Sequence, residues 1–134
     1  MNAFIVELKN KPGELAKVTE ALAEKGVNIT GFTGATNGDK GSVCLLTSDD
    51  TTARRALQDA HYRPREIELV VASLADKPGT LAEATRRLAN GGVNIEAALP
   101  IGMSGGSISV AFATDNPTKA RSLIGEHALS GSTR

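Results

Sequence analysis

The chain contains one stretch twice: Lys11-Pro12-Gly13 with Gly26-Val27-Asn28-Ile29, and Lys77-Pro78-Gly79 with Gly92-Val93-Asn94-Ile95. Both parts recur at the same offset of 66 residues, so no gap is needed between them. Further identities at this offset pair Leu8, Leu15, Thr19, Leu22, Asp49, Thr52, Arg55, Leu57 and His61 with Leu74, Leu81, Thr85, Leu88, Asp115, Thr118, Arg121, Leu123 and His127. We interpret this as an ungapped duplication, with one domain in residues 1–67 and a second in residues 68–134.

The same order of elements is predicted for each copy. Apolar, β-branched residues from Phe4 to Leu8 indicate a strand, and apolar residues at helical spacing after Pro12-Gly13 indicate a helix. Gly26 is typical of a residue that ends a helix, and a second strand is expected to follow it. A glycine-rich turn, a third strand and a helix capped near Asp49 come next, and a last strand is expected in residues 62–66.

These elements predict an α+β fold of two tandem ferredoxin-like βαββαβ units, because two βαβ crossovers that share one antiparallel sheet place both helices on one face. The last strand of the first copy runs into the first strand of the second with almost no linker. In the second copy, residues 128–134 are rich in Gly and Ser, which predicts a short or absent last strand.

The third strand indicates which side chains face the helices. In the second copy, Ile108, Val110 and Phe112 alternate with small residues, so we expect these three in the core. The ungapped repeat assigns Cys44 and Leu46 to this side in the first copy, with Cys44 as a small buried apolar residue. Apolar groups are then expected on the opposite sheet face, which favours a homodimer: Ile5, Val43, Leu45, Leu69 and Val71.

Composition excludes several classes of function. Fifteen basic residues balance fifteen acidic ones, and aromatic residues make up only 3%, so no nucleic-acid partner is expected. The single Cys44 and the absence of a metal-ligand spacing predict no disulfide, no metal and no cofactor, and they favour a cytoplasmic protein. No apolar leader or membrane anchor is expected either.

We also expect no enzyme, because no nucleophile with a base, carboxylate pair or metal set is recognisable. An acyl-phosphate hydrolase would need an arginine-bearing phosphate loop where residues 10–13 stand. The glycines from Gly102 to Gly106 join two strands, so they do not form a phosphate cradle at a helix start. His61 and His127 are interpreted as structural residues at helix ends.

Residues 8–16, followed by Gly26 to Ile29, resemble the ACT domain of amino-acid-sensing regulatory proteins, and residues 74–82 with Gly92 to Ile95 resemble a second one. The likeness covers nearly the whole chain and is greatest to small proteins made of two ACT domains. It implies sheets joined side by side and a small amino acid bound between domains, with regulation through a separate partner such as an enzyme or through self-association.

The resemblance also implies which residues contact the ligand. They lie in the loop before the first helix and at the start of the second strand: Asn10, Gly13, Glu14, Leu15, Asp76, Gly79, Thr80 and Leu81, with Asn28 and Asn94. The chemistry supports this, because a Pro-Gly helix start presents N–H groups and a positive dipole end to a carboxylate. Asp76 can accept hydrogen bonds from an ammonium group.

Other interpretations of the same residues remain open. Asn10 and Asp76 could act as helix caps, Asn28 and Asn94 as turn residues, and Leu15 and Leu81 as core residues with one side toward the pocket. Phe32 could crowd one of the two sites. The alternative function is a ligand-free interaction or dimerisation module that regulates a separate metabolic enzyme.

Overall fold

The structure, a computed structural model, describes residues 1–125. The chain divides into two compact units, Met1–Ile67 and a second that begins at Glu68. The first unit contains β1 (Asn2–Lys9), α1 (Glu14–Glu24), β2 (Ile29–Asn37), β3 (Lys40–Thr47) and α2 (Asp50–Asp59). After β4 (Arg65–Ala75), the second contains α3 (Thr80–Asn90), β5 (Ile95–Ser104), β6 (Ser107–Thr114), α4 (Pro117–Ala120) and the π-helical turn η1 (Arg121–Gly125).

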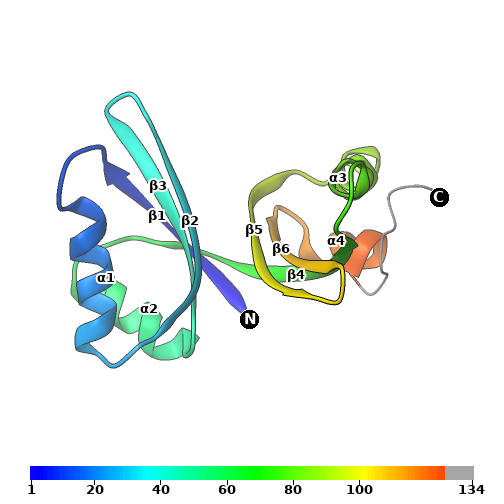
Figure 1. The fold of residues 1–134 in the computed structure, drawn as a ribbon. Coiled ribbons are helices and arrows are strands. Elements are labelled where there is room, and N and C mark those ends of the chain that lie inside the picture. Colours follow the sequence, from blue (N-terminus) through cyan, green and yellow to red (C-terminus); the bar gives the residue numbers. More distant parts are fainter. Residues whose placement is uncertain (126–134) are drawn as a thin grey trace. The chain divides into compact units, whose positions relative to one another are not determined.

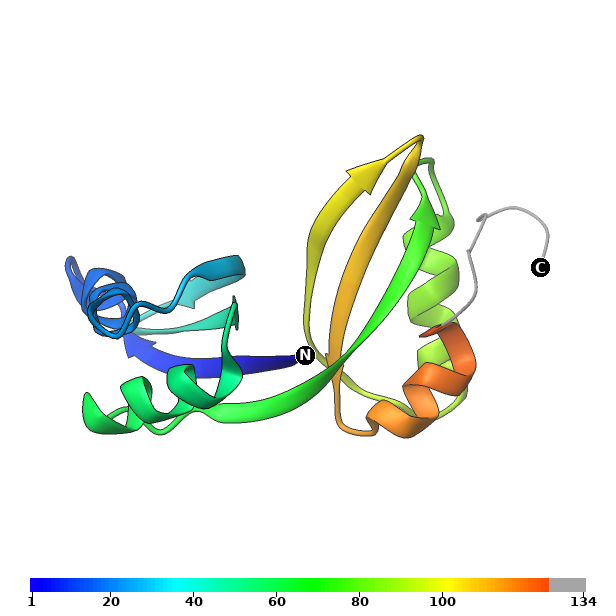
Figure 2. The same ribbon diagram turned by 90° about the horizontal axis from the view of Figure 1, so that it is seen from below.

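Two predictions fall outside the described residues: the structural role of His127 and the last strand in residues 128–134. The expected last strand of the first unit and the first strand of the second form one strand, β4, which continues without interruption from Arg65 to Ala75 (Figure 2). Within residues 1–125, no helix is long and apolar enough to span a lipid bilayer.

Each unit is a sheet with its helices on one face, as the ferredoxin-like prediction requires (Figure 1). The strand order is β2-β3-β1 in the first unit, with the start of β4 next to β1, and β4-β6-β5 in the second. Each unit has its own core between sheet and helices. The largest buried core residues are Phe4, Leu22, Leu45 and Leu57 in the first unit and Phe112, Leu88 and Ile124 in the second.

The helix ends follow the predicted chemistry. Gly26 and Gly92 have φ angles of 73° and 76°, a left-handed conformation that glycine adopts without strain. The N–H of the following valine donates to a carbonyl five residues back in each case, which is the Schellman arrangement. At the start of α2, the Asp49 carboxylate accepts hydrogen bonds from the N–H and hydroxyl of Thr52, at 3.1 and 2.6 Å.

The prediction of an ungapped repeat is wrong from the hairpin onward. The helix cap equivalent to Asp49 is Asn116, which accepts a hydrogen bond from the N–H of Lys119 at 3.1 Å, so the offset there is 67. Arg54 and Arg121 are also 67 residues apart, and each pairs with a glutamate of β4. The additional residue lies in β5, where the pairing with β6 shifts between Pro100 and Gly102 and leaves a bulge at Ile101.

This shift corrects the predicted faces of the first unit. Side chains on a strand alternate, so an error of one residue exchanges the two faces. Val43 and Leu45 lie in the helix-facing core, whereas Cys44 and Leu46 are buried but lie outside that cluster. Val43 and Leu45 are therefore not available to the apolar face that we predicted on the other side of the sheet.

Candidate functional site

Each unit has a groove at the same place. It lies between the loop after the first strand, the start of the first helix and the hairpin of the second and third strands. In the first unit, β1, α1, β2 and β3 enclose about 430 Å³, and in the second unit β4, α3, β5 and β6 enclose about 320 Å³. Each groove is lined by residues of a single unit.

Glycine sets the geometry of the helix start beside each groove. Gly13 and Gly79 stand at the N-caps of α1 and α3 with φ angles of 90° and 93°, and no side chain caps either helix. Because of this, the N–H groups of Leu15 and Ala16, and those of the equivalent Leu81 and Ala82, have no hydrogen-bond partner within residues 1–125. Free N–H groups at the positive end of a helix dipole suit a carboxylate ligand.

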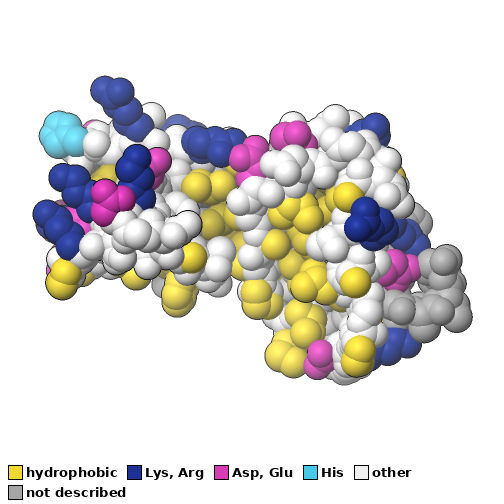
Figure 3. All heavy atoms as spheres, turned by 90° about the horizontal axis from the view of Figure 1, so that it is seen from above, with side chains coloured by type: hydrophobic (Ala, Val, Ile, Leu, Met, Phe, Trp, Pro, Cys, Tyr) yellow, Lys and Arg dark blue, Asp and Glu magenta, His cyan; other side chains and the backbone are white. Residues whose placement is uncertain are grey.

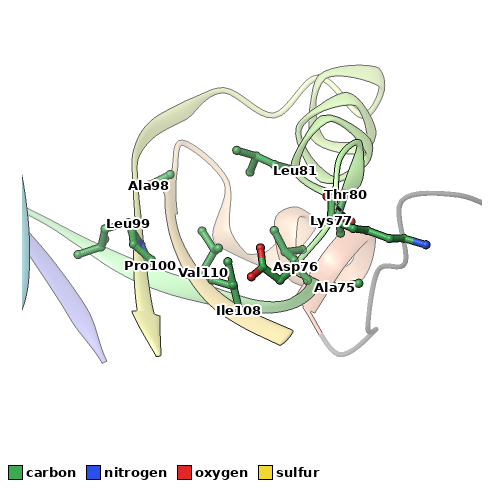
Figure 4. Close-up of a pocket in the computed structure, with 11 residues that line it drawn as sticks. Ala75, Asp76, Lys77, Thr80, Leu81, Ala98, Leu99, Pro100, Ile108 and Val110 are labelled. Atoms are coloured by element: carbon green, nitrogen blue, oxygen red, sulfur yellow. Dashed lines mark hydrogen bonds between the residues drawn. The ribbon is translucent and has the colours of Figure 1, made fainter. Parts of the chain in front are cut away.

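Asn10 and Asp76 line the grooves and do not cap the helices, so the capping interpretation is wrong. Asn10 Nδ2 donates to the carbonyl of Gly38 at 2.9 Å, which ties the loop to the β2–β3 turn. In the second unit, only the Asp76 N–H reaches the equivalent turn, by donating to Gly106 at 2.8 Å. The Asp76 carboxylate is turned toward Ile108 and Val110 of β6, and the Lys77 ammonium points away from them (Figure 4).

Glu14 and Thr80 stand at equivalent positions and give the two grooves different chemistry. Glu14 forms an ion pair with Lys17 at 3.1 Å. Thr80 is fully buried, and its hydroxyl donates to the carbonyl of Lys77 at 3.3 Å. The first groove therefore has a charged side chain at this position, whereas the second groove has a neutral one.

Leu15 and Leu81 are not core residues, since 47% and 54% of their surfaces are exposed. Both lie on the helix face that their spacing predicts. They are exposed because they lie in the first helical turn, beside the groove. In the first unit the sheet at this groove contains Gly34 and Gly41, and a Cβ atom at Gly41 would come within 2.8 Å of a carbonyl oxygen. Phe32 also lines this groove, yet it stays 67% exposed and does not fill it.

Asn28 and Asn94 lie away from the grooves of their own units. Each follows the C-terminal end of a helix of 11 residues, about 16 Å long, whose other end forms the groove. The backbone N–H of Asn28 donates to Ser48 Oγ, and that of Asn94 donates to Asp115 Oδ1. Their exposed side chains could reach a groove only if it belonged to a neighbouring domain.

The sequence did not identify the floor of either groove. Ile108 and Val110 were predicted as core residues only, and nothing in the sequence pointed to Ala98 and Pro100 as binding residues. All four nevertheless line the second groove. The adjacent strands β5 and β6 contribute these residues to the floor of the groove. Only the pairing of β5 with β6, including its bulge, brings them together.

Cys44, the single cysteine of the chain, is buried. Desolvation raises the pKa of its thiol to about 11, and a thiol with such a pKa is not a nucleophile at neutral pH. In the part of the chain that the structure describes, no three His, Cys, Asp or Glu residues are placed to hold a metal ion. The free N–H groups beside the grooves are suited to binding a small molecule.

The sequence matches the family of the ACT domain pair over residues 1–131. The chain belongs to this family. In fold, the ACT domain pair is similar to protein BT0572 from Bacteroides thetaiotaomicron, with 30% identity and a TM-score of 0.74 over 91% of this chain and 84% of that one. A comparison with curated proteins finds no significant match.

The ACT domain pair is also similar to the ligand-free regulatory subunit of aspartate kinase from Thermus thermophilus. The identity is 25% and the TM-score 0.59, over 89% of this chain and 87% of the subunit. A further likeness, to aspartate kinase from Clostridium acetobutylicum, concerns the fold alone, with 15% identity and a TM-score of 0.58 over 89% of this chain and 31% of that enzyme. The family and the similarity to the regulatory subunit support a regulatory, ligand-binding role.

Proposed function

We propose that this ACT domain pair is a regulatory protein that binds a small amino acid between ACT domains. The observation that carries the proposal is the groove beside a glycine-capped helix start, present at the same place in both units. Free N–H groups of the first helical turn bind the ligand carboxylate. Loop residues such as Asp76 bind the ammonium group, and Asn28 or Asn94 of a neighbouring domain completes the site.

The regulated activity belongs to a separate partner enzyme, as the similarity to an aspartate kinase regulatory subunit suggests. A ligand acts in such a system by binding one assembly state more tightly than another. We propose that the assembly includes a homodimer formed through the outer strands β2 and β5, where Met103 of β5 is 73% exposed. The free thiol of Cys44 fits a reducing, cytoplasmic compartment.

The same exposed outer strands favour the second candidate function, a ligand-free module that binds an enzyme through its strand edges. The two functions differ in their response to free amino acids. A ligand that binds only the folded state raises the melting temperature, whereas an interaction module shows no such rise. Sedimentation at micromolar concentration tests the dimer, which a purely monomeric protein would contradict.

We expect Asn28→Ala or Asn94→Ala to weaken amino-acid binding by about 1–3 kcal/mol, because a polar group of the ligand loses its partner. The fold should be unaffected, since both asparagines bond to Ser48 and Asp115 only through backbone atoms. The measurement is a thermal-shift screen against the twenty amino acids, followed by calorimetric titration of each variant. Unchanged affinity in both variants would refute the assignment of the asparagines.

A further inference from the structure

We propose that the two grooves have different ligands, and that the second groove selects amino acids with a branched aliphatic side chain. This inference rests on the proposed function and adds the ligand class and the unit that binds it. Leu81, Ala98, Pro100, Ile108 and Val110 contribute apolar surface, and hydrophobic side chains also gather over the second unit on the face shown in Figure 3.

One polar side-chain group of this groove, the Asp76 carboxylate, is available to a ligand. The Thr80 hydroxyl is bonded to the Lys77 carbonyl, and the Lys77 side chain points out of the groove (Figure 4). The Asp76 carboxylate is turned into the groove and has no hydrogen bond or ion pair with any residue in 1–125. A single carboxylate above an apolar surface is complementary to an ammonium group that carries an aliphatic side chain.

The first groove lacks this combination. In place of Asp76 it has Asn10, whose amide is bonded to Gly38, and its carboxylate, Glu14, is already paired with Lys17. Lys9 also lines it, where the second groove has Ala75, and its positive charge disfavours an ammonium group. Its floor contains glycines where the second groove has Pro100 and Ile108, so an aliphatic side chain would find less surface to contact there.

The size of the second groove narrows the ligand further. Its volume of about 320 Å³ is at the lower end of the range for small-molecule sites, roughly 300–1,000 Å³. Valine, isoleucine and leucine are small enough for this space. Against this apolar lining, a polar or charged side chain would lose hydration without gaining a hydrogen-bond partner, so serine, aspartate and lysine are disfavoured.

The repeat supplies matched variants for the test. Ala98→Phe introduces the side chain that the first unit has at the equivalent position, Phe32, and Asp76→Asn introduces the equivalent of Asn10. Ala98 and Asp76 are exposed, so neither substitution disturbs the core. Phe32→Ala and Asn10→Ala in the first unit are the controls. Calorimetric titration uses L-leucine, L-isoleucine, L-valine, L-serine, L-aspartate and L-lysine, and 4-methylpentanoate as a leucine analogue without its ammonium group.

We expect the three aliphatic amino acids to bind more tightly than the others, and 4-methylpentanoate to bind about tenfold more weakly than leucine. Ala98→Phe and Asp76→Asn should each weaken leucine binding by about tenfold or more, whereas the control variants leave it unchanged. Tighter binding of serine, aspartate or lysine would overturn this inference and keep the proposed function. Aliphatic binding that is lost in Phe32→Ala but kept in Ala98→Phe would also overturn it, and no binding of any amino acid would refute the proposed function itself.

Discussion

The two units have the same helix starts and each has a core between its sheet and its helices, but they differ by one residue in an outer strand. β2 has 9 residues and β5 has 10, and the additional residue of β5 is accommodated in a bulge beside the hairpin. The pairing β6 makes with β4 is regular throughout, so Val110 and Phe112 keep their places in the core. An insertion in an outer strand is therefore tolerated because one side of that strand has no partner to lose.

The same comparison shows which features of the site depend on the backbone and which on side chains. Gly13 and Gly79 give both units the same helix start, so both have a groove. The side chains at the edges differ, with Asn10 and Glu14 in one unit and Asp76 and Thr80 in the other. The shared backbone provides the same groove in both units, and the divergent side chains give the two grooves different chemistry.

The largest effect is expected in the cores, where Leu45 is the counterpart of Phe112 at the corrected offset of 67. Phe112→Ala should destabilise the second unit by about 3–5 kcal/mol and Leu45→Ala the first by about 2–5 kcal/mol, because each leaves a cavity. Chemical denaturation followed by circular dichroism measures both. Cys44→Ala is the neighbouring control and should cost about 1 kcal/mol; a loss at Cys44 equal to that at Leu45 would contradict the corrected register.

A smaller, pH-dependent effect is expected for the ion pairs of β4. Arg54 Nε and Nη2 donate to both oxygens of Glu66 at 2.6 Å, and Asn2 Nδ2 donates to the same carboxylate. These hydrogen bonds, chiefly those from Arg54, lower the pKa of Glu66. Because the pKa of Glu66 is lower in the folded state than in the unfolded state, where it is about 4.3, the ionised carboxylate stabilises the fold at pH values above about 4.3. This stabilisation is lost as the pH falls through the pKa of the folded state.

Glu66→Gln should therefore destabilise the first unit at pH 7, and the difference from wild type should shrink as the pH falls below about 4. Thermal unfolding between pH 2.5 and 7 measures this dependence. Glu68→Gln is the matched variant in the second unit, where the Glu68 side chain that pairs with Arg121 is 54% exposed against 23% for Glu66. A larger effect at Glu68 than at Glu66 would reverse the expected order.

The helix caps test the offset of 67 independently. Asn116→Ala should cost the second unit about 1 kcal/mol, because the N–H of Lys119 loses its acceptor. The equivalent cap, Asp49, is ionisable, and the hydrogen bond from the Thr52 hydroxyl lowers its pKa. The Asn116 contribution should not change between pH 3 and 7 in thermal melts, whereas the Asp49 contribution should fall toward pH 3. An Asn116→Ala variant as stable as the wild type would show that Asn116 is not the cap and would contradict the offset of 67.

The fold was predictable because both copies have glycine and proline at the helix ends and apolar residues at the spacing of a helix or a strand. The hairpin offset was not predicted, since Asp49, Thr52 and Leu57 match Asp115, Thr118 and Leu123 at 66 by coincidence of common residue types. Matches at 67 were present as well, among them Thr47 with Thr114 and Ala53 with Ala120. The ambiguity arises because the periodicity of a helix fixes which residues share a face but does not fix their alignment with another helix.

The smallest effect is expected at the end of α2, where the first unit uses histidine for a position that glycine occupies at the ends of α1 and α3. His61 has a φ angle of 70°, and its N–H donates to the Gln58 carbonyl while the next N–H donates to Leu57, as in the Schellman arrangement. A left-handed conformation costs a side-chain-bearing residue about 1–2 kcal/mol, and glycine's greater freedom in the unfolded chain offsets part of this gain. His61→Gly should therefore stabilise the first unit by about 0.5 kcal/mol and raise its melting temperature by roughly 2–4 °C. Gly26→Ala, the reverse exchange at an equivalent site, should lower it, and a fall in both variants would show that the exposed imidazole stabilises the helix end by more than its backbone strain costs.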